Sequence, residues 1–253
     1  MFIIRKILLY LNPILFIISL ELIRTQGSFW WIFLLVNLLL LTVTLWEFSK
    51  RVLNHRLANF LVAPFVFIIT VFGFLMFFEN DLIYRFVYLI AAVFIYLYLE
   101  QTLNYFYFTN KYQPYTLENL SLYINVLSVF FLTSSIFSSL IFLRLSVIIS
   151  AIIIYLIIFI LTHQISWSNK LIWHDYKIFC VIISLIIAEI FFVVSYLPLN
   201  FYVNALLVSI VFYVVVSLSR LFLLRSLDKK NVLEHLIVSS VAVVLILLTA
   251  QWN

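Results

Sequence analysis

The chain has 253 residues, of which 66% are hydrophobic and 10% are charged, and its mean hydropathy is +1.22. Soluble domains have about 45–50% apolar and about 25% charged residues, so this composition excludes a water-soluble fold and predicts that lipid surrounds most of the chain. The formal net charge is +5, but the cations lie between the apolar runs, where they set membrane topology, and this excludes a nucleic-acid partner.

Nine apolar runs are long enough to cross a bilayer as helices, since a helix of about 20 residues spans its hydrocarbon core. The predicted spans are Ile7–Ile23, Phe29–Trp46, Asn59–Phe78, Tyr84–Phe108, Leu120–Leu143, Leu145–Ile165, Lys177–Leu197, Phe201–Leu224 and Leu236–Trp252. Asn12 and Pro13 interrupt the first, so eight spans remain if that helix does not cross. The runs lack the alternation of barrel strands. We therefore predict an all-α, polytopic membrane helix bundle, with residues 1–253 in a single transmembrane domain.

The loop charges predict the orientation of this bundle. The side with the N-terminus carries Arg5, Lys6, Lys50, Arg51, Arg56, Lys111, Lys170, Lys177, Arg220, Arg225, Lys229 and Lys230, and the opposite side carries Arg24, Arg85 and Arg144. Cation-rich loops stay in the cytoplasm. The N-terminus is therefore predicted inside, in a multi-pass protein of the cell membrane.

No pattern in the sequence is typical of a cofactor or metal site. The four histidines show neither HExxH spacing nor a Cys/His pairing. With only two glycines, the chain has no phosphate-cradling loop. We predict no cofactor, no metal and no catalytic residue. Enzymatic activity stays open, and we favour a protein that is not an enzyme.

Glu189 is the first intramembrane candidate. It lies 12 residues after Lys177 and 8 before Leu197, so about 12 Å of helix separates it from the outer face. A carboxyl at that depth must be protonated, hydrogen-bonded or in contact with water. Asn37 and Ser209 lie at comparable depth on other spans and are its predicted partners. The alternative is that Glu189 is a neutral acid that fastens two helices.

A polar stretch in the fourth predicted span gives the second candidate site. Tyr96, Glu100 and Asn104 are four residues apart and lie on one stripe of a helix. This stripe must face protein or water rather than lipid. It predicts either a polar groove open to the cytoplasm or hydrogen bonds between helices.

The last third of the chain resembles a known family. Glu189, the run Tyr196-Leu-Pro-Leu-Asn200, Tyr213, the run Asn231-Val-Leu-Glu-His235 and Gln251-Trp252 are similar to the C-terminal part of small bacterial membrane proteins that form a domain of unknown function. The resemblance implies a polytopic helical protein of the bacterial inner membrane. It implies no activity.

Three functions fit these features. The first is a transporter or channel-like component for a small or lipidic solute, with Glu189 and Glu100 lining its path. The second is a non-catalytic scaffold or assembly subunit, whose basic loops meet anionic headgroups, a membrane protein partner or a second copy of the chain. The third is a membrane-embedded enzyme that acts on a lipid-linked substrate, with Glu100 or Glu189 as acid or base.

Overall fold

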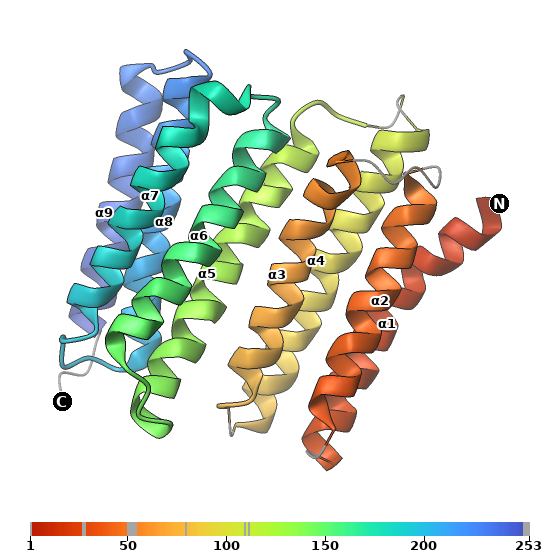
Figure 1. The fold of residues 1–253 in the computed structure, drawn as a ribbon, viewed down its shortest axis with the longest axis horizontal. Helices are drawn as coiled ribbons and strands as arrows, with labels where there is room; N and C mark the ends of the chain where they lie inside the picture. Colours follow the sequence, from red (N-terminus) through yellow and green to blue (C-terminus); the bar gives the residue numbers. More distant parts are fainter. Residues whose placement is uncertain are drawn as a thin grey trace. The chain divides into compact units, whose positions relative to one another are not determined.

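A computed structural model describes residues 2–26, 29–49, 55–78, 80–108, 110 and 112–249. Within these residues it contains nine helices and no strand (Figure 1). The helices are α1 (Phe2–Gln26), α2 (Trp30–Phe48), α3 (His55–Leu75), α4 (Asp81–Tyr107), α5 (Thr116–Phe142), α6 (Val147–Ser168), α7 (Trp173–Val194), α8 (Phe201–Leu223) and α9 (Lys229–Thr249). The predicted all-α class is confirmed. The basic loop residues Lys50, Arg51 and Lys111 and the terminal Trp252 lie outside the described residues.

Among the described residues, eight helices, α1 to α8, are long and apolar enough to cross a membrane. The first helix meets this criterion although Pro13 lies inside it. In the described part of α9 the apolar segment is shorter and runs over Val232–Ile246. The fold is therefore that of a helical membrane protein.

The chain divides into two compact units, and each is described by itself. Unit 1 is Met1–Asn125 and unit 2 is Val126–Asn253, so the division falls within α5. Unit 1 contains α1–α4, drawn red to yellow in Figure 1, and unit 2 contains α6–α9, drawn green to blue.

In unit 1, two buried hydrogen bonds join α1 to α2. Asn12 Nδ2 donates to Thr44 Oγ1 at 2.7 Å. Asn37 Nδ2 donates to Ser19 Oγ at 2.8 Å. Asn12, which interrupts the predicted first span, is thus buried against α2, where it finds the hydrogen-bond partner that lipid does not offer.

Helices α1 and α4 run antiparallel and meet along their length. At one end, the Arg5 guanidinium carbon lies 4.0 Å from the centre of the Tyr107 ring. Farther along, the rings of Tyr10 and Tyr96 stack with centroids 5.7 Å apart. The opposite end holds a network of charged side chains that borders a cavity.

The segment between α4 and α5 is held by Tyr112. Its hydroxyl donates to Glu118 Oε2 at 2.9 Å, and its ring lies 5.3 Å from that of Tyr105. Burial raises the pKa of Tyr112, and the hydrogen bond to Glu118 raises it further. Tyr112 therefore stays a neutral donor that ties the loop to the first turn of α5.

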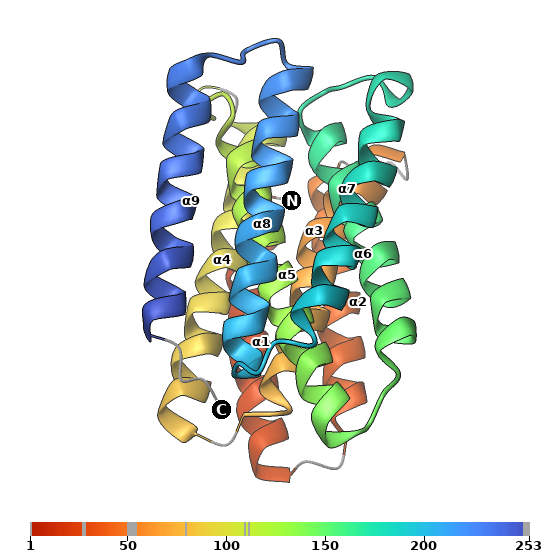
Figure 2. The ribbon, with the colours of Figure 1, turned by 90° about the vertical axis from the view of Figure 1, so that its left-hand side faces the viewer.

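Unit 2 is built around α7, which contacts α6 on one side and α8 on the other. The rings of Phe137 and Phe191 stack at 4.5 Å and link the unit 2 part of α5 to α7. Figure 2 shows α8 and α9 side by side. A 2.9 Å hydrogen bond between the Tyr213 hydroxyl and His235 Nδ1 joins these two helices.

Two helices of unit 2 end in left-handed caps that carry basic residues. Lys170 has φ 61° after α6, and Arg225 has φ 54° after α8. In both caps the next residue, Leu171 or Ser226, donates its N–H to the carbonyl five residues earlier. This is the pattern of a Schellman motif, where the cations also complement the negative end of the helix dipole.

The Asn12 to Thr44 hydrogen bond is expected to contribute measurably to the stability of unit 1. In a double-mutant cycle of Asn12→Leu and Thr44→Val, we expect a coupling of about 0.6 kcal/mol, and at most about 1.7 kcal/mol, as for other side-chain hydrogen bonds between membrane helices. The measurement is equilibrium unfolding in mixed detergent micelles.

Thr42→Val is the matched control, because the Thr42 hydroxyl donates to the Leu38 carbonyl of its own helix. Its effect should add to that of Asn12→Leu. Strict additivity of the Asn12 and Thr44 changes would show that their contact contributes nothing.

Candidate functional site

A cavity of about 520 Å³ lies at one end of unit 1, where α1 and α3 end and α2 and α4 begin. We call it the unit 1 cavity. It is lined by Leu20, Ile23, Arg24, Trp30, Phe72, Leu75, Met76, Phe78, Asp81 and Tyr84. Seven of these lining residues are apolar or aromatic, and the other three are two charged side chains and a tyrosine, while polar atoms make up slightly more than half of the exposed wall.

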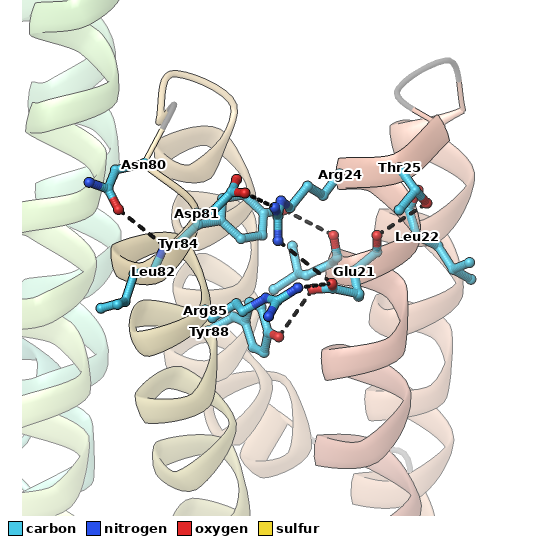
Figure 3. A network of polar contacts seen from close by, with 11 residues as sticks. Glu21, Leu22, Arg24, Thr25, Asn80, Asp81, Leu82, Tyr84, Arg85 and Tyr88 are labelled. Carbon is cyan, nitrogen blue, oxygen red and sulfur yellow. Dashed lines mark hydrogen bonds and ion pairs between the residues drawn. The ribbon is translucent and has the colours of Figure 1, made fainter.

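The charged side of the cavity is an ion pair between α1 and α4, formed by Arg24 Nη2 and Asp81 Oδ2 (Figure 3). Asp81 is placed by the start of α4, where Asn80 Oδ1 accepts hydrogen bonds from the N–H groups of Leu82 and Ile83 at 3.1 and 3.2 Å. Asparagine is a favoured N-cap, and an aspartate in the first turn complements the helix dipole. The local sequence therefore fixes Asp81 beside Arg24.

Glu21 is the centre of the network beside this ion pair (Figure 3). Its Oε1 lies 3.2 Å from Arg85 Nη2 and 3.7 Å from Arg24 Nη1. Its Oε2 accepts a hydrogen bond from the Tyr88 hydroxyl at 3.1 Å. Two carboxylates thus face two guanidinium groups, and the network carries no net charge.

Arg24 also has an unused hydrogen-bond donor. Its Nη1 atom is buried and has no hydrogen-bond acceptor among the described residues. Beside it, the Tyr84 hydroxyl donates to the Leu20 carbonyl at 3.0 Å, so this hydroxyl is already engaged. A buried donor without an acceptor is costly, and Arg24 is the cationic hydrogen-bond donor of the cavity wall.

This arrangement suits an amphipathic molecule. The apolar wall can hold a hydrocarbon chain, and the Arg24 guanidinium can donate to a polar head. Within the described part of the chain, no group of three or more His, Cys, Asp or Glu side chains is placed to hold a metal ion.

Asn37 and Ser209, which the sequence predicted as partners of Glu189, form hydrogen bonds with other groups. Asn37 is buried, and its Nδ2 donates to Ser19 Oγ and to the Phe33 carbonyl. Ser209 is also buried and donates to the Leu206 carbonyl of its own helix at 2.9 Å. Both side chains therefore find hydrogen-bond partners inside the protein, and none of these partners is a carboxylate.

Glu100 and Asn104 lie half-buried on α4, toward its C-terminal end. The Tyr96 hydroxyl interacts with Glu100 and with Tyr10 of α1. The structure thus brings Tyr96 and Glu100 of the predicted stripe together and adds Tyr10, which sequence reasoning did not include. Among the described residues, the Asn104 side chain has no hydrogen bond.

Glu189 is exposed on α7 and makes no hydrogen bond or ion pair with a described residue of unit 2. Helix α7 ends at Val194, not at the predicted Leu197, because turns precede Pro198 and a residue before proline disfavours the helical region. Glu189 therefore lies about 7.5 Å of helix from this end, closer than predicted.

The network of Glu21, Arg24, Asp81 and Arg85 was missed by sequence reasoning, which treated the two arginines only as topology signals. A signal was present, since Glu21 and Arg24 are three residues apart and Asp81 and Arg85 four, the spacings of ion pairs on one helix face. This spacing did not indicate that α1 packs against α4.

The apolar helices define a helical membrane protein. The chain belongs to a family described as Protein of unknown function (DUF5656), whose match covers residues 21–249. The predicted membership of a family of unknown function is confirmed, but its limitation to the last third is wrong, because the match already begins within α1. No curated protein and no solved structure matches the chain significantly.

Glu21→Gln should destabilise unit 1 more than Tyr88→Phe, because Glu21 has three partners and Tyr88 contributes one hydrogen bond to the network. The Glu21 and Arg85 side chains are 37% and 56% exposed, so solvent screens the pair and each ion pair is worth about 0.2–1 kcal/mol. The measurement is the melting temperature in mild detergent.

Salt provides the control for this prediction. In about 1 M NaCl the Debye length is about 3 Å, so the difference between wild type and Glu21→Gln should shrink, while the effect of Tyr88→Phe should not. A Glu21→Gln effect that does not depend on salt would rule out the ionic contribution.

Proposed function

We propose that this membrane protein is a transport component for a lipidic solute and that the unit 1 cavity binds this solute. The observation that carries the proposal is the composition of the cavity wall, which joins apolar and aromatic side chains to a polar surface that includes the Arg24 guanidinium. A phospholipid or similar amphiphile matches both parts.

The charge of the network favours a lipidic solute over a small ion. Glu21 and Asp81 balance Arg24 and Arg85, so the site attracts neither strongly anionic nor strongly cationic solutes from a distance. An amphiphile instead gains its binding free energy by placing its chain against the apolar wall. The sequence left open a small or a lipidic solute, and the lipidic solute therefore fits the site better.

The polar head also needs a route along the protein, and we place this route at the contact between α1 and α4. The unit 1 cavity lies at one end of these two helices, and the group of Tyr10, Tyr96 and Glu100 lies farther along the same pair. Hydroxyl and carboxyl groups along the contact give a polar head successive partners inside the bilayer.

We further propose a multi-pass protein of a bacterial inner membrane with its N-terminus in the cytoplasm. The excess of Lys and Arg on the side of the N-terminus supports this orientation. The unit 1 cavity then opens at the outer end of α1, and the basic loops, such as 225–230, face anionic headgroups of the cytoplasmic leaflet.

The function is tested by lipid translocation in vesicles of phosphatidylcholine that contain a trace of acyl-labelled fluorescent phosphatidylcholine. Wild-type protein should make the probe of the inner leaflet accessible to dithionite added outside. Arg24→Gln should slow this exchange at least about tenfold, since a hydrogen bond to a charged group contributes about 1.5–3 kcal/mol.

Arg144→Gln is the matched control, because Arg144 is an exposed arginine of unit 2 that does not line the cavity. It should exchange lipid at the wild-type rate. Met76→Trp should slow exchange by filling the cavity without removing a polar group. Exchange by wild type no faster than in protein-free vesicles would refute the function.

The orientation predicts opposite results for two reporter fusions. We propose that α9 crosses as a ninth span, which places the two ends of the chain on opposite sides. A fluorescent protein, which matures only in the cytoplasm, should then be bright when joined before Met1 and dark when joined after Asn253. An alkaline phosphatase fusion should give the reverse pattern. A bright C-terminal fusion together with a bright N-terminal one would contradict the predicted arrangement.

A further inference from the structure

A second site lies in unit 2, between the two helices of the hairpin formed by α6 and α7. Here a groove of about 550 Å³ runs between the two helices. Its lining includes Ile148, Ala151 and Tyr155 of α6 and Ala188, Glu189 and Phe192 of α7. We call it the Glu189 groove. Both helices are apolar enough to span a membrane, so this groove lies at membrane depth.

The groove contains two polar groups that the chain does not satisfy. Glu189 is exposed, and among the described residues neither its carboxyl nor the hydroxyl of Tyr155 has a hydrogen-bond partner. Hydrocarbon offers neither a hydrogen bond nor solvation to a carboxyl group. The groove is therefore incomplete until a partner reaches Glu189.

The walls of the groove suit a helix better than a flat surface. Ala151 and Ala188 are small residues on facing helices, and small side chains let a third helix approach closely in a membrane. Apart from Glu189 and Tyr155, the remaining lining residues are apolar.

The complement of an unpaired carboxyl is a cation. A second copy of this chain does not supply one at this depth, because Arg24 and Arg85 are already paired with Asp81 and Glu21, and Arg144 lies in the loop after α5 rather than within a helix. The partner is consequently a different polypeptide.

We infer that the Glu189 groove docks a transmembrane helix of a partner protein and that this helix carries a Lys or Arg at the depth of Glu189. The ammonium or guanidinium group pairs with the carboxylate, and the pair removes the cost that each charge would carry alone in lipid. Tyr155 can add a hydrogen bond to the same pair. The inference is independent of the proposed lipid transport.

The test uses the full-length protein in lipid vesicles and two synthetic Leu/Ala transmembrane peptides. One peptide has a single Lys in its outer third, and the other has Leu at that position. Energy transfer between labelled protein and labelled peptide should show roughly 5- to 30-fold tighter association of the Lys peptide, the range expected for one polar contact between membrane helices.

Glu189→Gln should abolish the preference for the Lys peptide, and Glu100→Gln, the matched change on α4, should preserve it. Ala151→Phe provides a second variant that fills the groove and should weaken binding of the Lys peptide while leaving the carboxyl in place. Elution as a single species in detergent checks that each variant is folded.

Three results would overturn the inference. These are equal association of both peptides with the wild type, a preference for Lys that survives Glu189→Gln, and a self-associated protein that excludes both peptides from the groove. The last result would assign the groove to a second copy of the chain.

Discussion

The arrangement of unit 1 depends on one constraint, namely that a polar group within a lipid-facing helix must find its partner inside the protein. Helix α1 shows this most clearly. Asn12 and Ser19 bond to α2, whereas Glu21 bonds to α4. Because these three residues lie on two faces of α1, the helix cannot rotate without losing partners on one side. It therefore sets the positions of its neighbours, and the unit 1 cavity forms at the end where these contacts leave space.

Several buried hydroxyl groups of unit 2 are satisfied in a different way. Thr162, Ser184 and Ser209 donate to carbonyls three or four residues earlier in their own helices. Such bonds satisfy the hydroxyl but do not fix one helix against another. The contacts between helices instead include stacked rings, such as Phe137 on Phe191, and the hydrogen bond of Tyr213 to His235. The two units thus share a composition but differ in what specifies their packing.

The number and class of the helices could be predicted because they depend on a one-dimensional property, the length of apolar runs against the thickness of a bilayer. The unit 1 cavity could not, since Arg85 and Tyr84 contact residues of α1 that are 64 positions earlier in the chain. Neither apolar periodicity nor charge counting indicates which helices become neighbours. For the same reason Glu189 was identified as unusual from its position alone, while the lack of a partner for its carboxyl became visible only once α6 was placed beside α7.

Glu21 and Glu189 illustrate how the surroundings decide the role of a carboxylate near a membrane. The chain gives Glu21 two arginines and a tyrosine, so its charge is neutralised within unit 1 and contributes to a closed network. Glu189 has the same side chain at a similar distance from the end of its helix, but it faces an apolar groove without a partner. A protein gains nothing in stability from such an exposed carboxyl in lipid. Its presence is explained when another molecule provides the missing charge. The Glu21 network is therefore complete within the chain, whereas the Glu189 groove is completed by a partner molecule.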